Sequence, residues 1–83
     1  MRANMTIVGF GQRRKGVSSK TNKPYDFQSV SVLYDDPYTV GQKAATVNMS
    51  GPDIDSKGGL NIGQELDVVF HTYNNAVVVD AIL

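Results

Sequence analysis

The residues on either side of Asn74-Asn75 constrain the fold more than any other part of the sequence. In ELDVVFHTY (65–73) polar and apolar residues alternate, with Leu66, Val68 and Phe70 on one side. AVVVDAIL (76–83) comes next and is rich in β-branched residues. Asn tolerates positive φ, so a two-residue Asn-Asn turn between such segments is typical of a β-hairpin. The end of the chain is therefore predicted to be antiparallel β-structure.

The rest of the chain shows the same preference, because helical periodicity is hard to find and β-branched or aromatic runs recur between turn residues. Residues 35–41 are predicted to form a turn and residues 50–59 a long loop. In residues 25–34 the apolar positions change from odd to even, which predicts a β-bulge near Ser29 and a sharp bend. The five predicted strands are residues 4–10, 25–34, 43–49, 65–73 and 76–83.

Alternation also predicts which side chains face the core in the remaining strands. In residues 43–49 the predicted inner row is Ala45, Val47 and Met49. In the last strand the same rule predicts an inner row of Val77, Val79, Ala81 and Leu83.

Five short strands in 83 residues predict an all-β domain spanning residues 1–83. The expected architecture is a small five-stranded OB-fold-like Greek-key barrel with a protruding basic hairpin. An SH3-like barrel or an open sandwich is the alternative. A chain this small buries a limited core, and with no cysteine it has no disulfide to support it. We therefore expect a homodimer. No apolar run suits a membrane span or a signal peptide, so a cytoplasmic protein is expected.

Charge is distributed very unevenly along a chain whose net charge is zero. Residues 1–24 carry six cations and no acid, whereas residues 25–83 carry two cations and eight acids. Five of the cations lie within residues 13–23: Arg13, Arg14, Lys15, Lys20 and Lys23. This separation favours one surface that binds a polyanion. The alternative is an ordinary solvated, disordered basic arm.

Catalysis, metal binding and cofactor binding have little support in the sequence. The single histidine, His71, has no second His or Cys to complete a nucleophile–base pair or a zinc site. Ser18 and Ser19 lie beside lysines, but adjacent loop residues rarely have the geometry of a Ser–Lys dyad. The Asp35-Asp36 pair and the acids of residues 53–55 are interpreted as surface residues, and the glycines of residues 9–16 lack a phosphate-loop spacing. No enzyme is predicted.

Binding of single-stranded nucleic acid has better support, because cations and aromatic residues occur together. Cations release counterions from a phosphate backbone, and aromatic rings stack on unpaired bases. The basic segment runs directly into Tyr25 and Phe27, and Tyr34 and Tyr38 come after them. Tyr25 and Tyr38 are expected to be exposed, and Phe27 is expected in the core. Tyr73, beside the Asn-Asn turn, is expected at a hairpin tip.

The stretch RKGVSSKTNKPY resembles the gene V type single-stranded DNA-binding proteins of filamentous bacteriophages. The shared pattern is Gly16-Val17-Ser18, a short polar and basic tip, and Lys23-Pro24-Tyr25. The resemblance covers about twenty residues closely and the rest in architecture only. It implies a five-stranded barrel, a two-fold dimer and cooperative coating of single-stranded phage DNA during replication. Messenger RNA is a further ligand of that family.

The resemblance also implies residue roles. Arg14, Lys20 and Tyr25 match the DNA-binding wing, and Tyr73 matches an aromatic residue that reaches across the dimer. Tyr34, Tyr38 and Lys43 match less closely. The tip is one residue longer here, with Ser19 extra and Asn22 in place of a frequent Gly. The family's basic residue in the last strand is missing, since that strand offers only Asp80.

The leading hypothesis is thus a sequence-tolerant single-stranded DNA-binding protein with no cofactor. The rival is a small β-barrel adaptor whose basic hairpin binds RNA or an acidic protein. The predicted nucleic-acid-binding residues are Arg13, Arg14, Lys15, Lys20, Lys23, Tyr25, Tyr34, Tyr38, Lys43 and Tyr73.

Overall fold

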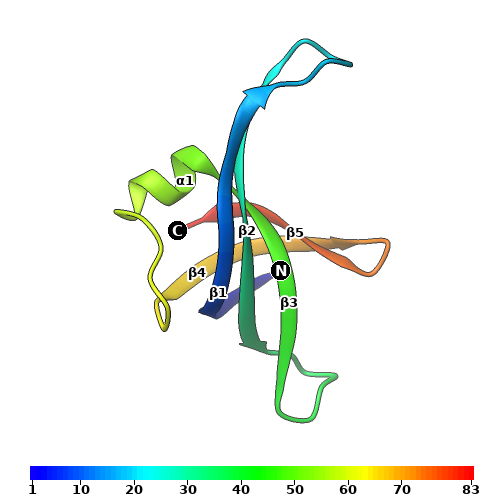
Figure 1. Cartoon of the computed structure of the whole chain (residues 1–83). Coiled ribbons are helices and arrows are strands. Elements are labelled where there is room, and N and C mark those ends of the chain that lie inside the picture. The colour runs from blue at the N-terminus through cyan, green and yellow to red at the C-terminus, as the bar shows by residue number, and fades with distance from the viewer.

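The computed structural model describes all 83 residues and is mostly β, with a five-stranded antiparallel sheet and one short helix (Figure 1). The strand order in the sheet is β3-β2-β1-β4-β5. The elements are β1 (Arg2–Val17), β2 (Pro24–Asp35), β3 (Gln42–Ser50), α1 (Gly51–Ser56), β4 (Glu65–Tyr73) and β5 (Ala76–Ile82).

One face of the curved sheet forms the core, as the alternating sequence requires. The predicted inner residues of β4 are buried, as are Val47 and Met49 of β3. Ala45 packs against the same cluster. The buried hydrophobic residues are Met5, Ile7, Val30, Val32, Tyr34, Val47, Met49, Ile54, Leu66, Val68 and Phe70.

The two edge strands of the sheet, β3 and β5, approach each other without pairing. Some of their Cα atoms lie within 8 Å of one another. Each strand is nevertheless hydrogen-bonded on one side only, β3 to β2 and β5 to β4. The sheet is therefore not closed into a barrel by hydrogen bonds.

The irregularity expected in residues 25–34 lies in the neighbouring strand instead. β2 pairs with β3 in unbroken register from Phe27 to Asp35. The register shifts between β1 and β2 leave the extra residues on β1, at Val8 and at Gly11-Gln12. The second shift lies opposite Ser29, so the predicted irregularity exists at this level but belongs to β1. β2 is regular there, and Tyr25 and Phe27 lie on its outer face. The apparent change from odd to even positions arises because these two outer-face aromatic residues precede the core row of Val30, Val32 and Tyr34.

Two other expectations are corrected by local structure. The predicted loop at residues 50–59 contains α1, which Ser50 caps by accepting a hydrogen bond from the Asp53 backbone N–H at 3.3 Å. In β5 the pairing skips Asp80, so the inward row continues with Ile82 and leaves Leu83 52% exposed.

The helix α1 has six residues, far fewer than the roughly 20 needed to cross a bilayer, and the structure has no other helix.

Candidate nucleic-acid interface

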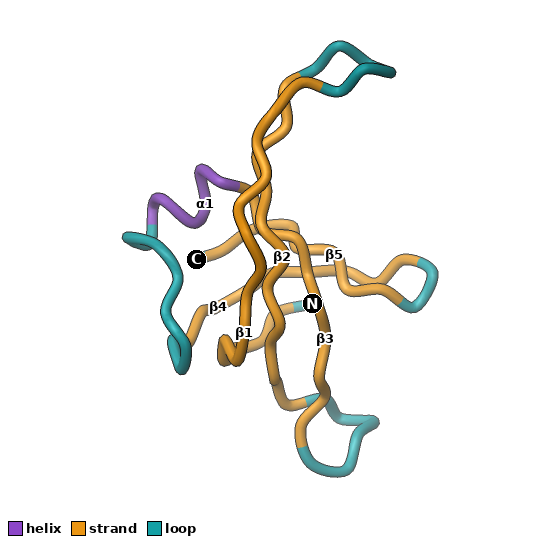
Figure 2. The backbone as a smooth tube through the Cα atoms, in the orientation of Figure 1, coloured by secondary structure: helices purple, strands orange, loops and turns teal.

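The ends of β1 and β2 continue past the body of the sheet as a two-stranded ribbon, here called the wing (residues 13–28; Figure 2). Arg13 pairs with Gln28 at its base, and Val17 pairs with Pro24 below the tip. The tip is ordered by main-chain hydrogen bonds, from Ser18 N–H to the Lys23 carbonyl at 2.9 Å and from Asn22 N–H to the Ser18 carbonyl at 2.8 Å. Asn22 has a φ of 55°, which Asn tolerates better than most residues.

The cross-strand register divides the wing into two faces, because directly paired residues point to the same side of a ribbon. The outer face carries Arg14 opposite Phe27 and Gly16 opposite Tyr25. The inner face carries Lys15 opposite Asp26. Arg14 and Lys15, which are adjacent in the sequence, therefore lie on opposite faces of the wing.

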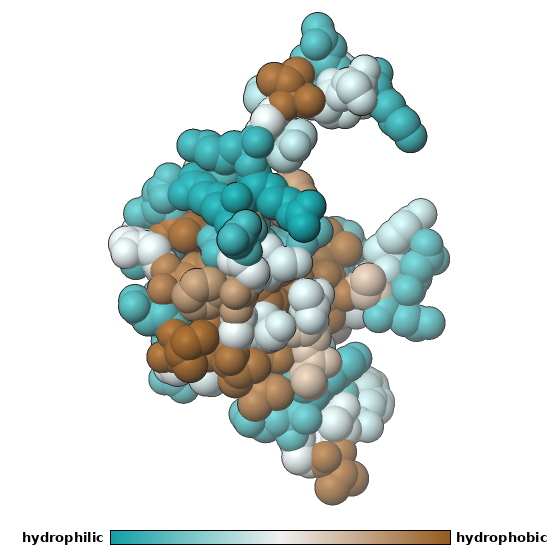
Figure 3. Space-filling view, in the orientation of Figure 1, coloured by the Kyte–Doolittle hydropathy of each residue, from teal (hydrophilic) through white to brown (hydrophobic).

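The outer face combines aromatic rings with an unpaired cation. Tyr25 is 43% exposed and its ring lies across Gly16, where a Cβ atom would come within 2.9 Å of the ring carbon Cζ. Phe27 is half-buried beside it, with ring centroids 5.8 Å apart, and lies outside the core cluster, so the prediction that Phe27 belongs to the core was wrong. Arg14, opposite Phe27, is exposed and has no carboxylate partner. Figure 3 shows a large hydrophilic patch at the base of the wing, and hydrophilic, intermediate and hydrophobic surface farther out along it.

Small side chains extend this outer face from the wing onto the body of the sheet. Ser29 pairs with Asn48, and Ser31 pairs with Thr46. Gly9 is the partner of Ser31 on the other side. These residues form a row of small, mostly polar side chains, here called the polar floor, that starts beside Phe27. The floor was not predicted from the sequence, although the alternation of Ser with Val in residues 29–32 was a visible signal for it.

On the inner face, Arg13 is held between two carboxylates. Its Nε and Nη2 donate to the Oδ1 and Oδ2 of Asp26 at 2.8 and 2.7 Å. Its Nη1 and Nη2 donate to the Oδ1 and Oδ2 of Asp55 at 2.8 and 3.1 Å. These hydrogen bonds lower the pKa of both carboxyl groups and raise the pKa of Arg13. Arg13, which the sequence analysis placed among the phosphate contacts, is thus not a free cation.

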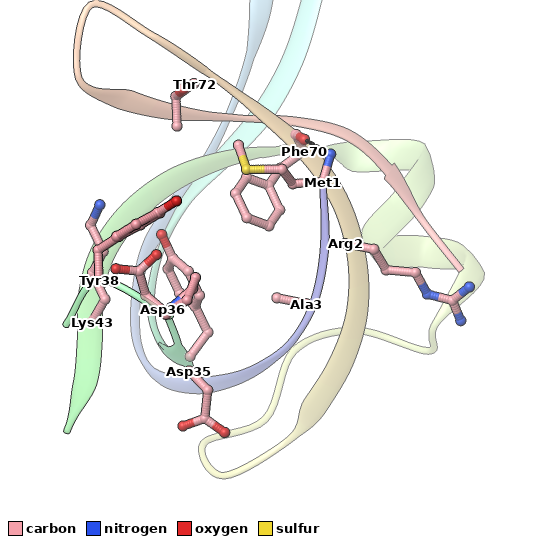
Figure 4. Close-up of a pocket in the computed structure, with 11 residues that line it drawn as sticks. Met1, Arg2, Ala3, Asp35, Asp36, Tyr38, Lys43, Phe70 and Thr72 are labelled. Carbon is pink, nitrogen blue, oxygen red and sulfur yellow. Dashed lines mark hydrogen bonds between the residues drawn. The ribbon is translucent and has the colours of Figure 1, made fainter. Parts of the chain in front are cut away.

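Three predicted residues meet at the other end of β2, around a cavity of about 510 Å³ (Figure 4). They are Tyr34, Tyr38 and Lys43. Tyr34 is only 3% exposed and meets the ring of Phe70 edge-on at 5.6 Å, so its ring cannot stack on a base. Tyr38 is 96% exposed at the cavity mouth. Tyr34 lies nine positions after Tyr25, or about 30 Å along an extended strand.

Tyr73 lies apart from both regions. It is 68% exposed beside the tip of the β4–β5 hairpin, where Asn74 and Asn75 have φ values of 50° and 63°. This tight turn confirms the predicted hairpin. The hairpin leaves the body in a different direction from the wing (Figure 1).

The remaining charges separate into paired and free groups. Arg2 forms an ion pair with Asp67, and His71 Nδ1 lies 2.8 Å from Asp80 Oδ1. On the wing, Arg14, Lys20 and Lys23 have no carboxylate within 4 Å, and Lys15 Nζ reaches Asp26 Oδ2 only at 3.9 Å. His, Asp and Glu side chains do not gather in groups of three that could hold a metal ion.

Comparisons of the chain with protein-family models, curated proteins and solved structures find no match.

Proposed function

We propose that this protein binds single-stranded nucleic acid, and single-stranded DNA above all, through the outer face of the wing. The observation that carries the proposal is the shared face of Arg14 and Tyr25, with Lys20 and Lys23 unpaired at the tip beyond them. Cations supply affinity through counterion release, and the ring supplies a platform for an unpaired base. Both requirements are met within a few residues on one exposed ribbon.

The polar floor and the mouth of the cavity extend the proposed path along β2. Small side chains at Ser29 and Ser31 leave room for a backbone to lie close to the sheet. Tyr38 and Lys43 at the far end supply a second ring and a second cation. Lys43 pairs with Tyr34 of the core row, so a strand bound at both ends would follow the outer face of β2 and then turn over the end of the sheet to the cavity mouth. Duplex DNA keeps its bases stacked inside the helix and cannot offer them to Tyr25 or Tyr38.

The order of the strands in the sheet also supports this proposal. An OB fold is a partly open five-stranded Greek-key barrel that binds oligonucleotides. The order β3-β2-β1-β4-β5, with Cα atoms of β3 and β5 within 8 Å of each other, supports this reading, because pairing of β3 with β5 would close the sheet into a five-stranded barrel. The resemblance to the phage proteins adds a homodimer, with Tyr73 reaching to the partner, and coating of phage replication intermediates.

The test is a titration with oligothymidine and with duplex DNA of equal length at two salt concentrations. We expect tighter binding of the single strand, quenching of tyrosine fluorescence, and a salt slope of about −3 if four phosphates are neutralised. Light scattering of the protein without DNA should give twice the monomer mass. Equal or absent binding of both DNAs would contradict the proposal and favour the rival, an adaptor for RNA or an acidic protein.

A further inference from the structure

Arg13 connects three elements that are distant in the sequence. It lies on β1, Asp26 on β2 is its partner at the base of the wing, and Asp55 on α1 is its partner on the body. We call these three residues the latch. The side chains of Arg13 and Asp26 are only 27% and 24% exposed, so this pair is partly buried, whereas the side chain of Asp55 is 64% exposed.

The start of α1 is shaped around the latch. Gly51 is buried, and a Cβ atom at this position would collide with the Asp26 carboxylate and the Arg13 guanidinium. No other amino acid fits there without displacing the ion pair. The helix is therefore seated directly against the base of the wing, and Asp55, one turn later, accepts the second pair of hydrogen bonds.

The latch also lies next to the point where β1 is least regular. Between Phe10 and Arg13 the register with β2 shifts, and Gly11 and Gln12 have no cross-strand partner. A bulge of this kind bends a strand and changes the direction of the residues beyond it. A ribbon that leaves the body after a bulge needs a further contact to fix its direction.

We propose that Arg13 is a positioning residue that holds the wing to α1 and so fixes the direction in which the outer face points. The part of this inference that concerns DNA rests on the proposed function, whereas the part that concerns the wing does not. Four of the five N–H groups of Arg13 are already used by carboxylates. A phosphate would have to displace two charged partners to reach it. Arg14, its neighbour in the sequence, has no such partner and contacts phosphate.

Two matched substitutions separate these roles: Arg13→Gln and Arg14→Gln remove the same charge from adjacent positions. Amide hydrogen exchange of residues 14–27 without DNA reports on the wing, and the salt dependence of oligothymidine binding reports on phosphate contacts. For Arg13→Gln we expect wing exchange to rise about tenfold through local opening. Its affinity should fall while the salt slope stays at the wild-type value.

For Arg14→Gln we expect the reverse, with unchanged exchange and a salt slope smaller by about 0.7. Arg13→Lys keeps the charge but not the planar fork, so its wing should exchange like that of Arg13→Gln. If Arg13→Gln lowers the salt slope by one phosphate and leaves wing exchange unchanged, Arg13 is a phosphate contact and the proposal fails.

Two less disruptive substitutions on α1 test the latch if Arg13→Gln does not fold. Asp55→Asn removes one partner of Arg13, and Asp53→Asn makes the same change on α1 at an acid that Arg13 does not contact. Faster wing exchange in Asp55→Asn alone is expected, and equal exchange in both variants would overturn the latch. Because exchange is measured without DNA, failure of the latch leaves the proposed DNA binding standing, and failure of DNA binding leaves the latch to be decided by exchange.

Discussion

Gly16 illustrates how a single missing side chain shapes the proposed site. The Tyr25 ring occupies the space above it, where a Cβ atom would lie 2.7 Å from the Tyr25 hydroxyl and 2.9 Å from Cζ. An aromatic ring that covers a cross-strand glycine protects the backbone and is held flat against the ribbon. One side of the Tyr25 ring therefore packs on the wing, and the other remains for a base.

Gly16→Ala tests this arrangement. The added methyl group should push the Tyr25 ring off the ribbon, because the ring is the flexible end of a side chain and moves more easily than the backbone. We expect binding of oligothymidine to weaken by up to about 1–3 kcal/mol, the contribution of one stacked base. The melting temperature should change little.

Gly11→Ala is the matched control for that variant. A Cβ atom at Gly11 would meet only the Ser29 Cβ, at 4.0 Å, which is an ordinary contact. Binding should be close to that of the wild type. If both alanine variants bind DNA alike, measured by tyrosine quenching, the flat Tyr25 ring is not a base platform.

At the scale of the elements, the wing and α1 depend on ionised carboxylates. The hydrogen bonds from Arg13 hold the pKa values of Asp26 and Asp55 below the ordinary 3.8. A carboxyl group whose pKa is lower in the folded state stabilises the fold at any pH above its unfolded value. The stabilisation is lost only as the pH falls through the lower, folded value.

This pH dependence can be checked by urea unfolding. The free energy of unfolding is measured for the wild type and for Arg13→Gln at several pH values. We expect a constant advantage of the wild type from neutral pH down to the ordinary carboxyl value of 3.8, and a shrinking advantage below it. An advantage that disappears while both carboxyl groups are still ionised, or that persists undiminished in strong acid, would show that these ion pairs do not stabilise the fold.

The strands that alternate regularly could be predicted from sequence, and the elements that break the pattern could not. The β4–β5 hairpin and the inner row of β3 were predictable from periodicity alone. The predicted inner row of β5 was wrong beyond Asp80, because one skipped residue moves every later side chain to the other face. Helix α1 was missed although Ser50, Pro52 and Asp53 form a recognisable helix start.

The candidate site was predictable as a region but not in its details. The exposure of Tyr25 and the tip cations of the wing could be predicted from their place in a basic turn segment. The burial of Tyr34 depends on Phe70, and the pairing of Arg13 depends on Asp55. Both partners lie far along the chain, so nothing local in the sequence distinguishes Arg13 from Arg14.

At the scale of the whole molecule, folding brings some cations of residues 1–24 against acids from the rest of the chain. Arg2 and Arg13 are neutralised by acids from the second part of the chain. The cations that remain free in residues 1–24 all lie on the wing. Acidic residues lie on α1 and at the cavity mouth instead. The wing is therefore the most positive part of the molecule, and we expect a polyanion to contact it first.

The most direct test is an NMR titration of the isotope-labelled protein with oligothymidine. We predict that the largest shifts occur on the outer face, at Arg14, Gly16, Tyr25 and Phe27, and that α1 and the inner face move little. Largest shifts on α1 or on the β4–β5 hairpin, with an unmoved wing, would contradict binding through the outer face of the wing.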